Sequence, residues 1–326
     1  MLKVSIKKHN IYILIYSLFL AVILSSIPWE YFRTGGFGDR LYYITYIDFI
    51  SNRIEWFDFS GLLNKIFNEW GWHYFLNFLQ KKFGFDSSVI LFLVSLFALT
   101  VAFFVVSLYK RFYLCLFLIN PMYIDFFYSQ IRLSFAIAFV YLSVIMFDKN
   151  KLLSVIILIP SFFIHTSSFI FIFIFYSAVF LAKVSFISSI KKYLISLLVG
   201  AIAAIATGPY MSVILGSFDD RRAEEYGDFS SPVLYMIYWI GLFLFIGIKA
   251  FSNKIDSLNI YYFYITSSIL TMVFLSIFLG GYPSRFIVAS FPFIILAISE
   301  FRGKNEFAIS FLYILYTAIL WIFWVS

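Results

Sequence analysis

Long apolar runs, separated by short polar or charged breaks, occupy most of this 326-residue chain. Crossing ~30 Å of hydrocarbon takes about 20 apolar residues in a helix, and fewer where the bilayer thins or the segment is shielded. On that scale the candidate spans are residues 11–27, 88–108, 112–128, 131–147, 151–164, 167–182, 191–208, 232–249, 258–279, 285–299 and 307–325. The pattern predicts an all-α polytopic membrane protein with about eleven transmembrane helices, in one integral-membrane domain over residues 1–326.

Two of the longest apolar stretches are divided at polar residues. Residues 151–182 would reach about 48 Å as one helix, at ~1.5 Å per residue, which is too long for a straight span. His165-Thr166-Ser167-Ser168 interrupts this stretch, and Ser129-Gln130-Ile131-Arg132 interrupts residues 112–147 in the same way. We therefore interpret each stretch as two short helices joined on the same side of the membrane.

Lysine and arginine are distributed unevenly over the two sides that these spans define. The side that holds the N-terminus carries 14 of the 24 Lys and Arg residues but only four of the 17 Asp and Glu residues. The positive-inside rule places this side in the cytoplasm. Two larger loops, residues 28–87 and 209–231, then lie on the outer side. Apolar positions recur every three or four residues between Leu62 and Leu79, which predicts an interfacial amphipathic helix in the first loop.

The amino-acid composition supports the assignment as a membrane protein and excludes other classes of protein. Hydrophobic residues make up 63% of the chain and charged residues 13%, against roughly half and a quarter in globular proteins. A soluble enzyme, a disordered linker and a nucleic-acid binder are excluded for the chain as a whole. The one cysteine, Cys115, has no partner for an intramolecular disulfide. No His/Cys cluster has metal-ligand spacing and no nucleotide-binding motif is present, so no metal or cofactor is expected.

Ionisable groups at membrane depth are costly and mark candidate functional sites. Arg132, His165 and Arg285 meet this criterion, and all three fall at the outer ends of predicted helices. An arginine at a helix end also snorkels to lipid headgroups, and a histidine there also serves as a hydrogen-bonded helix terminus, so both interpretations stay open. His73 is expected to be an interfacial side chain.

Cationic side chains on the outer face, beneath an aromatic-rich cavity, are suited to binding a lipid pyrophosphate. Two guanidinium groups can bind its oxygens in bidentate geometry and offset its charge. A histidine of near-neutral pKa can take a proton from a hydroxyl group. Together these groups favour transfer of a glycan from a lipid pyrophosphate to a sugar hydroxyl.

Several short motifs follow one another in an order that resembles a known family. They are Arg33-x-x-x-x-x-Asp39 with Tyr42, Tyr43 and Tyr46 downstream, Glu69-Trp70-Gly71-Trp72, Ile131-Arg132-Leu133-Ser134-Phe135-Ala136, His165-x-Ser167-Ser168, and Tyr282-Pro283-Ser284-Arg285. This order resembles the EpsG-like branch of Wzy-type polysaccharide polymerases, most closely over residues 25–180.

The resemblance implies a multi-pass enzyme of the bacterial inner membrane whose site faces the periplasm. Such an enzyme would join undecaprenyl-pyrophosphate-linked repeat units into O-antigen, capsule or exopolysaccharide. Its expected partners are that lipid-linked glycan and membrane lipid, with a chain-length regulator as a further candidate and no nucleic acid. Arg132 and Arg285 are expected to stabilise the departing pyrophosphate and His165 to act as the base, with Asp39 and Glu69 as alternatives. The expected substrate-binding residues are Arg33, Asp39, Arg40, Glu69, Gln130, Arg221, Arg222 and Tyr282.

Two other functions compete with polymerisation. A flippase or transporter of lipid-linked oligosaccharide is expected to have ionisable groups near the bilayer midplane and internal repeats. Neither feature is evident in the sequence. A membrane acyltransferase that modifies a glycan also uses a histidine in an apolar scaffold, but it would place its donor on the cytoplasmic side.

Overall fold

The computed structural model describes residues 8–50, 54–108, 112–216, 231, 233–251, 260–301 and 303–326. Over these ranges the chain forms helices and connecting segments, with no β-strand element. Five of the described helices are long and apolar enough to cross a membrane, or up to six if a bent helix pair is counted as one span. Three further apolar helices have between 10 and 17 described residues. The chain is therefore a polytopic α-helical membrane protein.

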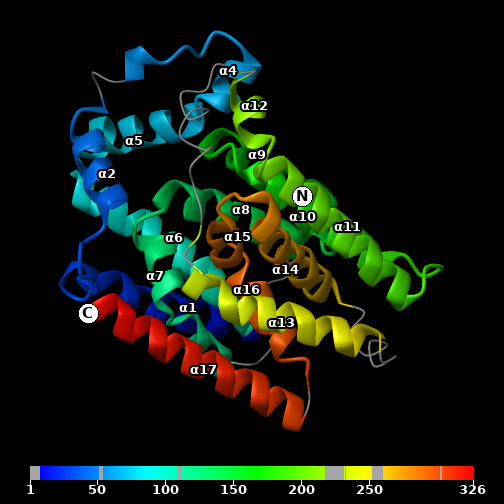
Figure 1. Ribbon diagram of the computed structural model, residues 1–326. Helices are drawn as coiled ribbons and strands as arrows, with labels where there is room; N and C mark the ends of the chain where they lie inside the picture. Colours follow the sequence, from blue (N-terminus) through cyan, green and yellow to red (C-terminus); the bar gives the residue numbers. More distant parts are fainter. Residues whose placement is uncertain are drawn as a thin grey trace. The chain divides into compact units, whose positions relative to one another are not determined.

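The chain divides into two compact units, and Figure 1 labels their helices. The first unit comprises residues 1–168 and 323–326, and the second comprises residues 169–322. Helices of the first unit are α1 (Lys8–Ser26), α2 (Gly38–Asp48), α4 (Leu62–Phe67), α5 (Trp70–Phe83), α6 (Ser87–Ser107), α7 (Pro121–Tyr128), α8 (Ile131–Phe147) and α9 (Lys151–Ile164), with 3₁₀ turns at Trp29–Tyr31, Ile54–Trp56 and Phe112–Leu118. Those of the second unit are α10 (Ser168–Lys183), α11 (Ser189–Thr207), α12 (Met211–Gly216), α13 (Val233–Phe251), α14 (Tyr261–Leu279), α15 (Pro283–Val288), α16 (Phe291–Ile298) and α17 (Lys304–Val325).

The predicted apolar runs all contain helix, but two of them are not single helices. Residues 112–128 form a 3₁₀ turn followed by the short helix α7, because Asn120 caps a new helix through Met122 N–H, at 2.9 Å, and Pro121 occupies its first position. Helix α7 then meets α8 at a bend of 98°. Residues 285–299 are likewise divided into α15 and α16, with Pro292 in the first turn of the second helix.

The predicted break at residues 165–168 is confirmed. Helix α9 continues past Pro160 and ends at Ile164, and α10 begins at Ser168. The predicted amphipathic helix from Leu62 to Leu79 is interrupted at residues 68–69, where α4 ends and α5 begins.

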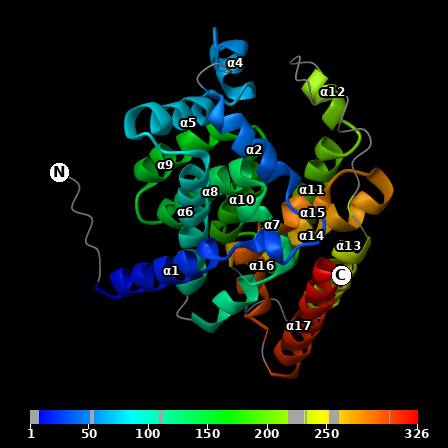
Figure 2. The same cartoon turned by 90° about the vertical axis from the view of Figure 1, so that its left-hand side faces the viewer.

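In the first unit, α1, α6, α8 and α9 pack in sequence through the contacts α1–α6, α6–α8 and α8–α9. Helices α8 and α9 approach closely because Ser143 and Ser154 face each other, with each hydroxyl donating to the other residue's carbonyl at 2.7 and 2.8 Å. Helices α2 and α5 pack against the ends of α6, α8 and α9 (Figure 2). The first turns of α6 and α8 and the last residue of α9 therefore lie at one end of this unit.

In the second unit, α11 packs directly against α14. A Cβ atom on Gly200 would lie 2.2 Å from the carbonyl oxygen of Ser268, so only glycine permits this approach. The Ser268 hydroxyl donates to the carbonyl of Ser196 at 2.8 Å, one helical turn before Gly200. Small residues that allow close backbone approach are typical of helix packing in membranes.

Candidate functional site

Glu69 has an unusual backbone conformation at the junction of α4 and α5. Its φ of 54° and ψ of 44° lie in the left-handed region, and it is the one non-glycine residue with positive φ in the described part of the chain. This conformation is costly for a side chain that has a Cβ, and such residues cluster at functional sites. The residue is also only 3% exposed. The local fold thus holds a buried carboxylate in a strained position.

The Glu69 carboxylate binds two basic side chains from other helices. Arg132 Nη1 donates to one carboxylate oxygen, and His165 Nδ1 donates to the other. The Thr166 backbone N–H is 3.4 Å from the same oxygen as His165. We call Glu69, Arg132 and His165 the Glu69 cluster. It joins the start of α5, the start of α8 and the end of α9.

Arg132 is also held by α2. Its Nε donates to the Tyr43 hydroxyl at 2.9 Å, and its guanidinium lies 5.6 Å from the centre of the Tyr43 ring. Burial raises the pKa of Tyr43, although the charge of Arg132 lowers it. Tyr43 therefore remains a neutral phenol that orients the guanidinium at physiological pH.

Helices α5 and α9 can form this cluster because a glycine lets them approach. A Cβ atom on Gly71 would lie 2.8 Å from Cβ of Phe163 and 3.1 Å from its carbonyl oxygen. The next residue, Trp72, is fully buried in the core that α2, α5, α6, α8 and α9 share. The Glu69 cluster is therefore positioned by a packed apolar core and not by a mobile loop.

His73 is buried, so its predicted interfacial position is wrong. Its Nδ1 is hydrogen-bonded to the Tyr46 hydroxyl, and its ring stacks on Phe57 with the ring centres 4.2 Å apart. One turn of α5 separates His73 from Glu69, and the ring points into the aromatic contacts of α2 and the loop before α4. Its role here is packing.

Arg33 forms a second ionic contact in the first unit, with Asp125 of α7. Gln130 Nε2 lies 3.4 Å from the other oxygen of that carboxylate. The Arg33 guanidinium also lies 4.7 Å from the ring centre of Phe37 and 5.5 Å from that of Trp324. Asp125 is not among the predicted site residues, because it stands inside an apolar run and only its contact with Arg33, 92 positions away, marks it.

Arg40 and Asp39 have different surroundings. The Arg40 guanidinium lies 3.8 Å from the ring centre of Tyr128 and donates to the Tyr128 carbonyl at 3.3 Å, and its Nε is 3.7 Å from Glu30. Burial lowers the pKa of Arg40, against the opposing charge of Glu30. Asp39 is exposed. Arg33, Arg40 and Gln130 thus all contact α7 or its junction with α8.

Arg285 and Tyr282 belong to the second unit. The Arg285 guanidinium lies 4.8 Å from the centre of the Tyr282 ring, and its buried Nε has no hydrogen-bond acceptor among the described residues. The expected convergence of Arg285 with Arg132 and His165 stays a prediction. Arg221 and Arg222 lie outside the described residues.

The Glu69 cluster has the arrangement of an oriented base. The Nδ1–H group of His165 donates a hydrogen bond to the carboxylate. In the neutral imidazole the lone pair is therefore on Nε2. The Glu69 charge also stabilises the imidazolium that forms when Nε2 accepts a proton, as a carboxylate does in hydrolase triads. Arg132, which is bound to the same carboxylate, places a cation beside the imidazole.

These observations define a multi-span α-helical membrane protein with an Arg–Glu–His cluster at one end of its first unit. The model of the EpsG family matches residues 10–326, and the chain belongs to the EpsG family. Membership of this family suggests a polysaccharide polymerase with glycosyltransferase-like activity. No curated protein and no solved structure matches the chain significantly.

Proposed function

We propose that this protein polymerises undecaprenyl-pyrophosphate-linked oligosaccharide repeat units at the periplasmic face of a bacterial inner membrane. The product would be O-antigen, capsule or exopolysaccharide. The observation that carries this proposal is the Glu69 cluster, because one buried carboxylate orients both a base and a cation. Membership of the EpsG family supports the same reaction class.

The proposed step is attack by an acceptor sugar hydroxyl on the anomeric carbon of the donor glycan. The hydroxyl proton passes to Nε2 of His165, the new glycosidic bond forms, and the bond between the anomeric carbon and the pyrophosphate oxygen breaks. Undecaprenyl pyrophosphate leaves with the electron pair of that bond. Arg132, together with Arg285, stabilises the charge that develops on it, and Glu69 holds the imidazole in the required tautomer.

The proposed topology has the N-terminus in the cytoplasm, eleven spans, and residues 28–87 and 209–231 in the periplasm. A reporter that is active only in the periplasm should give a signal when fused after Asp220 and none when fused after Asn253. The physical reason is the excess of Lys and Arg on the N-terminal side. The reverse pattern would place His165 in the cytoplasm and contradict the proposed periplasmic site.

Reconstitution tests the reaction directly. The full chain, purified into proteoliposomes with undecaprenyl-pyrophosphate-linked repeat units, should produce longer lipid-linked glycans and release undecaprenyl pyrophosphate in equal number to the bonds formed. Movement of the lipid-linked unit between leaflets without new glycosidic bonds would instead support the flippase. A chain-length regulator, which we propose as a partner, should alter the length of the products but not be needed for the bond-forming step.

The arginines should not tolerate lysine if they bind pyrophosphate in bidentate geometry. Lysine keeps the charge but is a point donor, whereas the guanidinium presents a planar pair of N–H groups. We expect Arg132→Lys and Arg285→Lys to reduce polymer length and amount at normal protein level, as measured by gel ladders of surface polysaccharide. Full-length polymer from either variant would show that the reaction does not need bidentate binding by that arginine.

A further inference from the structure

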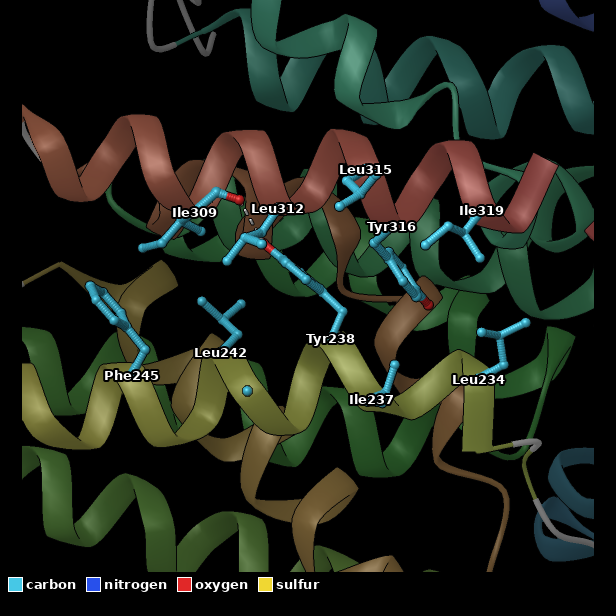
Figure 3. Close-up of a pocket in the computed structure, with 11 residues that line it drawn as sticks. Leu234, Ile237, Tyr238, Leu242, Phe245, Ile309, Leu312, Leu315, Tyr316 and Ile319 are labelled. Atoms are coloured by element: carbon cyan, nitrogen blue, oxygen red, sulfur yellow. Dashed lines mark hydrogen bonds between the residues drawn. The ribbon is translucent and has the colours of Figure 1, made fainter. Parts of the chain in front are cut away.

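An apolar groove lies between α13 and α17, both within the second unit. Its cavity volume is about 430 Å³, and Figure 3 shows Leu234 and Ile319 at one end and Phe245 and Ile309 at the other. The eleven steps from Leu234 to Phe245 correspond to roughly 16 Å of helix, about half of the ~30 Å hydrocarbon core. Both helices are candidate membrane spans. The groove is therefore about as long as one leaflet is thick.

The groove is open, and aliphatic side chains and aromatic rings line it. Ile237 on α13 is 61% exposed and Leu312 on α17 is 53% exposed. Gly241 keeps the groove wide, because a Cβ atom there would meet no described atom within 4 Å. The Tyr238 and Tyr316 rings stack with their centres 5.1 Å apart.

The two tyrosine hydroxyls make hydrogen bonds to the helices themselves. Tyr238 donates to the carbonyl of Ile309 at 3.3 Å, and Tyr316 donates to the carbonyl of Tyr235 at 3.1 Å. Trp239 Nε1 donates to the Tyr316 hydroxyl at 3.2 Å. These bonds hold both rings in place, and the remaining lining side chains are aliphatic or phenyl groups. Such a groove suits a hydrocarbon chain and not a sugar.

Arg285 is linked, through Ser284 and Ser231, to the segment of chain that precedes the Leu234 end of the groove. Ser231, three residues before Leu234, is hydrogen-bonded to Ser284, with the two hydroxyl oxygens 3.0 Å apart and the Ser284 N–H donating at 3.1 Å. Arg285 is the next residue. Three residues of chain span at most about 11 Å, so the backbone of Ser231 lies within that distance of Leu234, and Arg285 directly follows the residue that Ser231 contacts. Its Nε is buried and has no acceptor among the residues that the structure describes.

We infer that the α13–α17 groove binds the polyprenyl chain of a lipid pyrophosphate whose head group is bound by Arg285. This inference rests on the proposed function, which supplies that lipid as substrate. The surrounding lipid tails are as apolar as the groove, so the polyprenyl chain gains packing contacts there but no hydrophobic free energy. The ionic contact with Arg285 therefore supplies most of the affinity. A methyl-branched chain is wider than a straight acyl chain and suits a groove that a glycine keeps open between ring faces.

Filling the groove tests the inference. Gly241→Trp places a large side chain in the open space, and Leu244→Trp adds the same side chain to an exposed position of α13 outside the groove lining. The full chain, in nanodiscs of phosphatidylglycerol and phosphatidylethanolamine, is mixed with undecaprenyl pyrophosphate or uncharged undecaprenol, and bound lipid is counted by native mass spectrometry.

We expect Gly241→Trp to weaken binding of both probes about tenfold, since losing roughly ten carbon–carbon contacts is sufficient for that change. Leu244→Trp should bind both as the wild type does. Arg285→Ala should weaken binding of undecaprenyl pyrophosphate and leave undecaprenol unchanged, which separates the head-group contact from the groove.

Three outcomes would overturn the inference. Equal binding by Gly241→Trp and the wild type would exclude the groove while leaving the proposed reaction intact. Binding of undecaprenyl pyrophosphate in nanodiscs of phosphatidylethanolamine alone, but not in nanodiscs that contain phosphatidylglycerol, would show an ordinary phospholipid site. A wild-type chain that binds no undecaprenyl pyrophosphate would overturn the proposed substrate and the groove together.

Discussion

Replacing His165 by alanine is expected to leave the protein in the membrane at normal level while polymerisation slows by about 10²–10⁴-fold, the usual effect of losing a general base. Single repeat units should then accumulate on the lipid carrier. The structural cost is smaller, because the hydrogen bond between His165 and Glu69 is one of several contacts that hold α5 against α9. The measurement is the ratio of single to polymerised lipid-linked units in membrane extracts, at matched protein level.

Two further substitutions separate catalysis from folding at this position. His165→Gln and His165→Asn keep hydrogen-bonding groups that can contact Glu69, but neither can accept a proton near neutral pH. His73→Gln is the matched control, because His73 is an equally buried histidine of the same unit whose hydrogen bond goes to Tyr46. We expect long chains from His73→Gln and none from the other two. Long chains from either His165 variant would make His165 structural.

Most of the long apolar helices were predictable from the sequence to within a few residues, but the runs 112–128 and 285–299 were each predicted as one helix and are divided. The run 88–108, for example, corresponds to α6 at Ser87–Ser107. In lipid, a spanning backbone has to satisfy its own hydrogen bonds, so an apolar run has little alternative to helix. The break at His165 was predictable for the same reason, because its polar residues cannot remain in a lipid-exposed helix at low cost. The break between α7 and α8 was likewise predicted, at residues 129–132. The start of α7 depends on the Asn120 cap and on Pro121, and run length did not reveal it.

The pairing of the candidate residues was not predictable. Sequence placed Arg132 and His165 on one side of the membrane and ranked Glu69 below them, whereas the structure places the Glu69 carboxylate between the two. The contacts join residues 63 and 96 positions apart, and periodicity contains no information on such distances. The left-handed backbone conformation of Glu69 was also not predictable, because glycine, asparagine and aspartate are the residues that usually adopt the left-handed region. Helix α2, which supplies Tyr43, has too mixed a composition to be recognised as an amphipathic helix.

Glu69 is expected to be the most sensitive position of the chain, because its substitution disturbs a base and a cation at once. Glu69→Gln keeps the shape and the hydrogen-bonding oxygen but removes the charge, so Arg132 loses its buried counter-ion. Removing one partner of a buried ion pair typically costs roughly 3–5 kcal/mol, and the Glu69 side chain is only 4% exposed. We expect this variant to lose all long polymer and to unfold in detergent at a markedly lower temperature than the wild type.

The double variant Glu69→Gln/Arg132→Gln separates these two losses. Removing both charges leaves no unpaired buried ion, so much of the stability should return, as non-additive effects within an ion pair predict. Activity should not return, because His165 still lacks the carboxylate that sets its tautomer and the pyrophosphate still lacks its cation. Glu69→Gly offers a second comparison: it removes the left-handed strain of about 1–2 kcal/mol and should be more stable than Glu69→Ala, with no polymer from either. Normal polymer from the double variant would show that the Glu69 cluster only holds α5 to α8 and α9, and the base would then have to be sought outside it, with Asp39 the first candidate.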